Sequence, residues 1–182
     1  DDAVTVQVTP KGSSQSFERS FRYYASEFVG IDVDLNDPQG IFKDSSGNLY
    51  IANTNNHTIL KVDTYGVVTT IAGTGSAGDT GDGGLATSAR LDQPRGVFKD
   101  NSGDIYIADT KNHKIRRIDM FGDISTVAGT GDSGSSGDGG AAISARLAEP
   151  KAIIKDSSGN LYISDTNNDK IRKVNTSGVI ST

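Results

Sequence analysis

The stretch 94–119, PRGVFKDNSGDIYIADTKNHKIRRID, decides the fold of this 182-residue chain. It has a near copy on either side: residues 38–63 read PQGIFKDSSGNLYIANTNNHTILKVD, and residues 150–175 read PKAIIKDSSGNLYISDTNNDKIRKVN. Neighbouring copies are 56 residues apart, with no insertion or deletion between them. Because self-similarity at a fixed period is the signature of a repeat architecture, the sequence predicts one structural unit repeated three times.

Each copy predicts four short strands. In the second copy they fall at residues 96–99, 104–109, 114–119 and 123–128, rich in Val, Ile, Thr and Tyr and separated by Gly, Asn and Asp turns. Four antiparallel strands joined by tight turns make one blade of a β-propeller, so the predicted fold class is all-β with about three blades in the chain. Glycine-rich connections follow the copies, and each predicts one helical turn, before Leu91 and before Leu147.

These motifs resemble a known family. Residues 94–96 (PRG), 103–110 (GDIYIADT) and 112–116 (NHKIR) are similar to the NHL repeat, and the resemblance extends over residues 38–182. The Ala-Gly-Thr-Gly and Gly-Asp-Gly-Gly connections resemble the long-insert form of secreted and cell-surface propellers. The resemblance implies a propeller but no single function, because the family includes protein-binding, RNA-binding and enzymatic members.

The repeat count predicts an open structure. The expected organisation is an N-terminal extension followed by three repeats: 1–37, 38–93, 94–149 and 150–182. The third repeat is incomplete, because Thr182 aligns with Thr126 in the middle of a fourth strand. Propellers usually have four to eight blades, so we expect the open faces to be closed or extended by another chain or by further sequence.

The extension carries two features of its own. Val4, Val6 and Val8 alternate with polar residues, which predicts a strand. This strand either completes the last blade, within the chain or by donation to another chain, or is an ordinary extra strand. Five of the twelve aromatic residues lie in 17–28 and are expected to be buried against a blade or a neighbouring subunit: Phe17, Phe21, Tyr23, Tyr24 and Phe28.

Composition narrows the function classes. The net charge of −5 disfavours nucleic-acid binding, which usually needs a basic excess. No apolar run approaches the roughly 18 residues of a membrane span. The absence of cysteine excludes disulfides and thiolate metal sites.

The residues that could carry chemistry recur with the repeat. His57 and His113 occupy equivalent positions, where the third copy has Asp169. A residue that returns every 56 positions more often supports the fold, so we expect turn histidines bonded within their own blades. NHL-like lyases, by the family resemblance, need a convergent set of histidines around the channel, which two histidines on separate blades cannot build.

Carboxylates at the repeat positions allow two interpretations. Asp109 and Asp165, with Asn53 in the first copy, form either a ring around the channel or acceptors for turn amides, and we favour the second. The connections contain four aspartates that could suggest calcium: Asp79, Asp82, Asp132 and Asp138. Their spacing lacks the regular frame of calcium loops, so we expect turns there.

Two further features of the sequence concern the predicted surface. The third strands carry basic residues that could form a stripe for an acidic partner, although we expect a solvated, partly paired face: Lys61, Lys114, Arg116, Arg117, Lys170, Arg172 and Lys173. Asn56 and Asn175 begin glycosylation sequons in predicted turns, which favours a secreted protein.

The sequence therefore predicts a non-catalytic extracellular scaffold or protein-interaction module, with self-association into a closed oligomer or filament. We expect no catalytic residue, cofactor or metal. One alternative is a fragment of a larger ligand-binding or enzymatic propeller of lyase or hydrolase type. The other is an RNA-binding NHL module.

Overall fold

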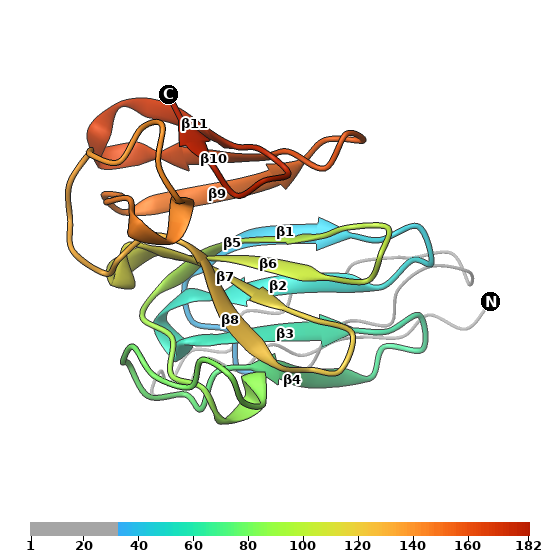
Figure 1. Ribbon diagram of the computed structural model, residues 1–182. Helices are drawn as coiled ribbons and strands as arrows, with labels where there is room; N and C mark the ends of the chain where they lie inside the picture. Colours follow the sequence, from blue (N-terminus) through green and yellow to red (C-terminus); the bar gives the residue numbers. More distant parts are fainter. Residues whose placement is uncertain (1–32) are drawn as a thin grey trace.

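The structure, a computed structural model, describes residues 33–182 and contains three four-stranded antiparallel sheets (Figure 1). We call the sheets blades 1, 2 and 3. Blade 1 contains β1 (Pro38–Lys43), β2 (Leu49–Asn53), β3 (Thr58–Val62) and β4 (Val68–Ala72). Blade 2 contains β5 (Pro94–Lys99), β6 (Ile105–Asp109), β7 (Lys114–Ile118) and β8 (Ile124–Ala128). Blade 3 contains β9 (Pro150–Lys155), β10 (Leu161–Asp165), β11 (Lys170–Val174) and β12 (Ile180–Ser181).

The all-β blade prediction is confirmed in strand number and order. The first strand of each blade begins at the repeat proline, two residues earlier than predicted. This is possible because a register shift follows Pro38 and Pro94 in the pairing with the second strand, and a proline has no amide hydrogen to donate there. The strand predicted at Val4, Val6 and Val8, and the aromatic residues of 17–28, lie outside the described residues.

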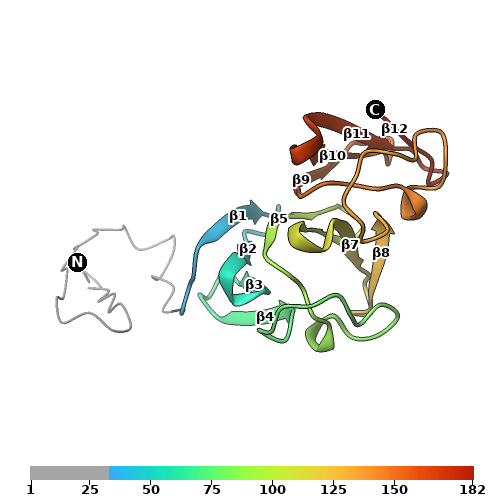
Figure 2. The same ribbon diagram turned by 90° about the vertical axis from the view of Figure 1, so that its left-hand side faces the viewer.

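The blades fan out from their first strands. β1 contacts β5, and β5 contacts β9, so these three strands form the inner edge of the assembly (Figure 2). The fourth strands lie at the outer edge. Blade 3 has a short fourth strand, β12, which pairs with β11 only through Lys173–Ser181 and Val174–Ile180.

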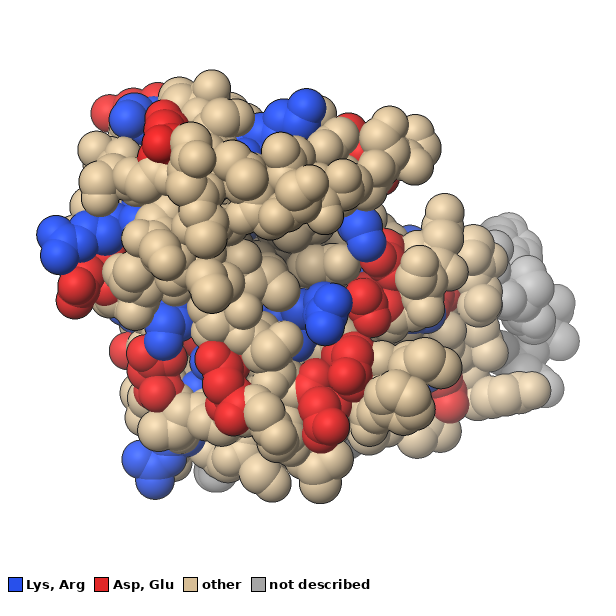
Figure 3. Space-filling view, in the orientation of Figure 1, with Lys and Arg blue, Asp and Glu red and all other residues tan. Residues whose placement is uncertain are grey.

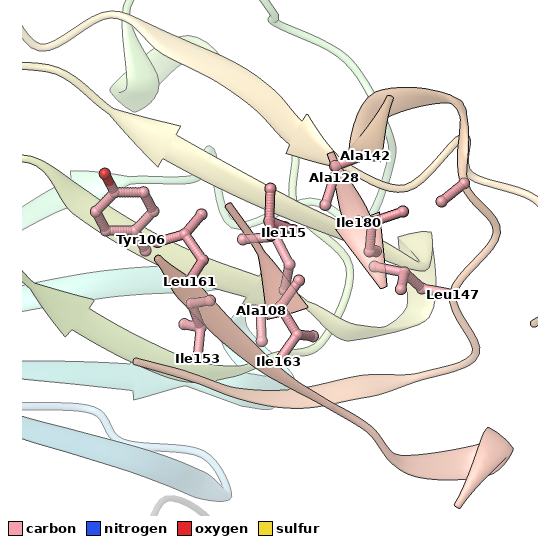
Figure 4. Close-up of a cluster of buried hydrophobic side chains, with 12 residues drawn as sticks. Tyr106, Ala108, Ile115, Ala128, Ala142, Leu147, Ile153, Leu161, Ile163 and Ile180 are labelled. Atoms are coloured by element: carbon pink, nitrogen blue, oxygen red, sulfur yellow. The ribbon is translucent and has the colours of Figure 1, made fainter. Parts of the chain in front are cut away.

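The apolar core lies between the blades, as the alternation of side chains along each strand requires. Between blades 2 and 3, Ile153 of β9 joins one buried cluster with Tyr106, Ala108 and Ile115 of blade 2 (Figure 4). Between blades 1 and 2, Val97 occupies the position of Ile153 in an equivalent cluster. Each blade thus has a back face that packs on the preceding blade and a front face that receives the next one.

Glycine allows the inner strands to approach closely. A Cβ added to Gly40 would lie 2.2 Å from the carbonyl oxygen of Arg95, and one added to Gly96 would lie 2.5 Å from that of Lys151. The third blade has Ala152 at this position, and it is exposed. A further blade cannot approach β9 as closely as β5 approaches β1.

The connections between blades are packed segments with 3-10 turns at Ala86–Ser88 and Ala142–Ser144, which confirms the predicted helical turns. Each connection also covers the outer edge of the following blade. Gly83 N donates to Ile124 O over 2.8 Å, and Ile124 N donates to Gly84 O over 2.8 Å. Gly139 and Gly140 make the same pair of bonds with Ile180. The sequence predicted turns here and missed this protection of an exposed edge.

Candidate functional site

The contact between blades is the main polar site of the molecule. Lys99 Nζ lies 3.0 Å from Asp44 Oδ2, and the hydroxyl of Tyr50 donates to the same oxygen over 3.2 Å. The same residue types form the contact between blades 2 and 3, because a lysine ends every first strand and an aspartate directly follows it. Between blades 2 and 3, Lys155 Nζ lies 2.6 Å from Asp100 Oδ2 and 3.0 Å from the hydroxyl of Tyr106.

Electrostatics favours the ionised form of this contact. Burial alone would raise the pKa of Asp44, but hydrogen bonds from Asn48 and Lys99 hold that pKa well below its usual range. Burial alone would lower the pKa of Lys99, and its hydrogen bonds to Asp44 and Tyr50 raise it instead. The carboxylate and the ammonium are therefore both charged at neutral pH.

Two further contacts cross from one blade to the next. The hydroxyl of Thr54 donates to Pro94 O, and that of Thr110 donates to Pro150 O, each over 2.8 Å. His57 Nδ1 accepts from Gln93 N over 3.1 Å, next to the first residue of the following blade. His113 makes the same bond with Glu149 N. Both histidines lie in turns, as predicted, and each is bonded within its own 56-residue repeat, but the partner is the last residue of the connection rather than a residue of the four-stranded sheet.

Within the part of the chain that the structure describes, the outermost blades hold unpaired halves of this site. Asp156 and Tyr162 on blade 3 correspond to Asp44 and Tyr50, and no lysine contacts Asp156 within residues 33–182. Lys43 on blade 1 corresponds to Lys99 and is exposed. The surrounding apolar residues are also open: Ile41 is 68% exposed, Ile154 57% and Ile171 61%. Inside the molecule, Val97 and Ile153, the equivalents of Ile41, are buried, and so is Ile115, the equivalent of Ile171. Phe98, the equivalent of Ile154, is half-buried against the apolar cluster between blades 2 and 3.

A second polar network joins each connection to the next blade. Asp109 is fully buried and accepts from Asp92 N over 2.8 Å, from Asn112 Nδ2 over 2.9 Å and from Arg116 NH1 over 3.3 Å. Arg116 is 1% exposed, and its NH2 also lies 2.6 Å from Asp82 Oδ1 of the connection. Asp165, Arg172 and Asp138 repeat this arrangement in blade 3.

These contacts confirm that Asp109 and Asp165 accept turn amides. They correct the prediction of a solvated basic face, because Arg116 and Arg172 are buried. Lys114 is partly paired as predicted, with Nζ 2.6 Å from Asp79 Oδ2. Burial raises the pKa of Asp109 to about 6, although the bonds from Asn112 and Asp92 and the charge of Arg116 lower it.

Blade 1 lacks this network. Leu60 stands where blades 2 and 3 have arginine, and Asn53 stands where they have aspartate. Asn53 keeps the structural bond, since its Oδ1 accepts from Asn36 N over 2.8 Å. A hollow of about 330 Å³ lies beside them, lined by residues that include Val33, Thr70 and Gly75.

The connection aspartates are paired with cations. Asp79 contacts Lys114, Asp82 contacts Arg116, and Asp138 contacts Arg172, while Asp132 lies 3.3 Å from Arg146. No group of three or more potential metal ligands occurs in the described chain. Figure 3 shows basic and acidic side chains next to one another on the visible face rather than as a continuous field of one sign.

A polar groove of about 480 Å³ lies between the first turns of blades 1 and 2. Ser45 and Ser46 line one wall, and Asn101 and Ser102 line the other. The interblade pair of Lys99 and Asp44 also contributes to its lining. Hydroxyl, amide and charged groups thus meet in one accessible depression.

The two sequon asparagines differ in their surroundings. Asn175 is exposed, and its Oδ1 accepts from Ser177 N and Val179 N, each over 3.0 Å. Asn56 is half-buried, and its Nδ2, the atom that would carry a glycan, donates to Asp34 O over 2.8 Å. Among residues 33–182, no helix is long and apolar enough to span a membrane.

Comparison with known proteins identifies relatives for this arrangement. Residues 74–136 and 129–182, together more than half of the chain, match the family described as the teneurin NHL domain. The chain is 36% identical over 104 residues to "Protein SUPPRESSOR OF QUENCHING 1, chloroplastic" of Arabidopsis thaliana, covering 57% of this chain and 10% of that protein. It is 40% identical over 100 residues to mouse teneurin-4, covering 48% of this chain and 4% of that protein.

Solved structures agree with the fold. An auxiliary nutrient binding protein from Bacteroides thetaiotaomicron superposes with a TM-score of 0.61 and 28% identity, covering 78% of this chain and 36% of that one. Virginiamycin B lyase from Staphylococcus aureus superposes with a TM-score of 0.52 over 79% of this chain and 40% of that one. Its 16% identity supports the fold alone. This chain spans much less than two thirds of each of these proteins.

Proposed function

The chain belongs to the NHL-repeat β-propeller family, and we propose that it is a non-catalytic extracellular scaffold or protein-interaction module. Its open faces would bind a further blade. The observation that carries this proposal is the pair of half-sites that find no partner among residues 33–182, Asp156 with Tyr162 on blade 3 and Lys43 on blade 1. The repeated Asp, Arg, His and Thr side chains, which could otherwise do chemistry, are engaged in contacts between blades and connections.

A second copy of the chain offers the matching surface. If blade 1 of one copy follows blade 3 of another, at the larger separation that the Cβ of Ala152 requires, Lys43 lies opposite Asp156 and Tyr162, as Lys99 lies opposite Asp44 and Tyr50. Thr166 then faces the carbonyl of Pro38, as Thr54 faces that of Pro94. Ile41 would cover Ile171, and burying large aliphatic side chains stabilises an interface by roughly 1.5–3 kcal/mol each.

Solution mass tests this proposal. Sedimentation equilibrium of the 19.1 kDa chain is expected to give two chains per particle. Lys43→Glu should yield a monomer, because it places two acids together in a partly dry contact. Lys61→Glu makes the same charge change on β3 of blade 1 and should leave the mass unchanged.

One variant should strengthen the contact. Ala152→Gly removes the Cβ that prevents close approach to β9, so it should tighten association by about tenfold, or roughly 1.4 kcal/mol. A monomer at every concentration, or a Lys43→Glu variant that associates like the natural chain, would reject self-association.

A ligand-binding propeller is the second candidate function. It is supported by the 28% identity to the nutrient-binding protein and by the polar groove beside Ser46 and Ser102. The test is a titration with a panel of mono- and oligosaccharides, read as a rise in melting temperature. Ser102→Trp should abolish the rise, and Ser158→Trp, the equivalent change in blade 3, should not. No rise with any sugar would count against this candidate.

An extracellular location and N-linked glycans remain part of the proposal. The exposure of Asn175 supports a glycan there, and the bonded amide of Asn56 disfavours one. Expression in a glycosylating secretory host should add one glycan that Asn175→Gln removes and Asn56→Gln does not. A glycan-free secreted chain would contradict this. The test of secretion is needed because the relative from Arabidopsis thaliana is named as chloroplastic, which is not an extracellular location.

RNA binding is the least supported function. Two of the basic residues on the third strands, Lys114 and Arg116, already form ion pairs with Asp79 and Asp82. Retention of RNA that falls steeply with salt would reverse this ranking.

A further inference from the structure

The hollow on blade 1 lies where a connection would dock. In blade 2 the same positions are filled by the connection. Asn112 Nδ2 donates to Gly78 O over 2.7 Å, and the hydroxyl of Thr126 donates to Asp82 Oδ2 over 2.7 Å. Their counterparts in blade 1, Asn56 and Thr70, line the hollow of about 330 Å³. Blade 1 therefore keeps the shape of a docking site for a connection.

The chemistry of this site has changed. In blade 2 the buried guanidinium of Arg116 requires the carboxylates of Asp109 and Asp82. In blade 1, Leu60 and Asn53 offer no charge to an acidic segment. Leu60 lies in a small apolar cluster with Ile51 and Val62. An apolar segment would bury this surface without leaving a charge unpaired.

The outer edge of blade 1 is the second observation. Ile124 and Ile180, on the edges of blades 2 and 3, each exchange two backbone hydrogen bonds with the connection. Val68 is their counterpart on β4, and no residue from 33 to 182 makes these bonds to it. Val67 beside it is 57% exposed. An uncovered edge strand of this kind is a site for another segment to pair.

The course of the chain points to one occupant. Val33 packs against the apolar cluster of Leu60 and also lines the hollow. Asp34 O accepts from Asn56 Nδ2, the bond that Gly78 O makes with Asn112 in blade 2. The chain therefore enters the docking site from its N-terminal side. Residues 17–32 precede it directly and contain Phe, Tyr, Val and Ile residues but no Gly-Asp-Gly-Gly motif.

We propose that residues 17–32 of the same chain dock on the back of blade 1, filling the hollow beside Leu60 with apolar side chains and pairing with the outer edge at Val68. Phe, Tyr, Val and Ile side chains, in place of aspartates that bind a buried arginine, would hold this segment on the blade, with its charged residues toward solvent: Glu18, Arg19, Arg22, Glu27 and Asp32. The test below reads the outer edge at Val68, so its outcome does not depend on the self-association proposed above.

Amide hydrogen exchange of the full chain tests the proposal, with Ile124 and Ile180 as internal references. The Val68 amide should exchange about as slowly as those of Ile124 and Ile180. Deleting residues 1–32 should accelerate exchange at Val68 at least about tenfold and leave both references unchanged. A synthetic peptide of residues 17–32 should restore protection when added to the shortened chain.

Two further measurements distinguish docking of residues 17–32 from docking of a second copy. Leu60→Arg should accelerate exchange at Val68, because an unpaired charge would enter the hollow, while Leu60→Met should not. Protection in the full chain should be unchanged on dilution, whereas loss on dilution would assign the site to a second copy. Equal Val68 exchange with and without residues 1–32 would overturn the proposal even if the shortened chain folds less stably, because Ile124 reports global unfolding.

Discussion

Blades 1 and 2 share their strands, turns and interblade contacts, yet they differ at the position where a connection arrives. Blade 2 receives an acidic connection and buries Arg116 with Asp109. Blade 1 has Leu60 and Asn53 at these positions and a hollow beside them. Arginine and aspartate are thus present together or absent together. This follows from the cost of burying one charge without the other.

The difference between blades 1 and 2 distinguishes two structural roles of the repeat. The contact of Lys99 with Asp44 and Tyr50 joins blade to blade, and its residue types occur in all three copies. The Arg116 network joins a connection to a blade, and it occurs only where a Gly-Asp-Gly-Gly connection precedes the blade. A single residue at the position of Leu60 therefore indicates what kind of segment covers that blade.

Removal of the buried carboxylate should have the largest effect. Asp109→Ala leaves Arg116 with only the connection aspartates and removes the acceptor of Asp92 N. We expect a loss of about 3–5 kcal/mol in the free energy of unfolding. Asn53→Ala in blade 1 removes only neutral hydrogen bonds and should cost about 1–2 kcal/mol. Urea unfolding measures both, and equal losses would contradict the distinction between the blades.

A pH dependence should appear in blade 2 and not in blade 1. The pKa of Asp109 is about 6 in the folded protein, against about 3.9 in an unfolded chain. The folded state therefore binds this proton more tightly. Its contribution to stability is complete below pH 3.9 and is lost as the pH rises through 6. Relative to Asp109→Asn, the natural protein should lose up to about 3 kcal/mol between pH 4 and 7.

The control for this titration is Asp44. Its depressed pKa stabilises the fold above the unfolded value, and this contribution is lost only as the pH falls below about 3.9. Since Asp44 is present in both proteins, it cancels in their difference. A difference that stays constant between pH 4 and 7 would show that Asp109 remains ionised throughout.

Converting blade 2 to the residues of blade 1 should cost less than breaking the pair. In the double variant Asp109→Asn with Arg116→Leu, no charge stays buried, and Asp82 remains 46% exposed to solvent. We expect a loss of about 1–2 kcal/mol, with a coupling between the two changes of about 1–3 kcal/mol. Double-mutant cycles in urea measure it, and purely additive losses would mean that the pair does not act as a unit.

The sequence predicted the repeated fold better than the polar sites. Proline, glycine and β-branched residues recur with fixed spacing, so strands and turns could be assigned locally. The partner of His57 could not, because Gln93 is 36 residues away and meets it only when the next blade docks. Burial of Arg116 was missed for the same reason. A signal was available: Leu60 and Asn53 replace arginine and aspartate together, in the one copy without a preceding Gly-Asp-Gly-Gly motif.

The smallest expected effect is at the rim of the same network. Lys114 Nζ lies 2.6 Å from Asp79 Oδ2, but that aspartate side chain is 38% exposed. Its counterpart in blade 1 is the uncharged Thr58. Lys114→Met should therefore cost only about 0.5–1 kcal/mol in dilute buffer, and most of this loss should disappear in about 1 M salt, where the screening length is roughly 3 Å. Thr58→Val, the matched change in blade 1, should show no salt dependence. If Lys114→Met instead cost as much as Asp109→Ala at every salt concentration, the connection would be held mainly by its rim, and the residue at the position of Leu60 would no longer predict what covers a blade.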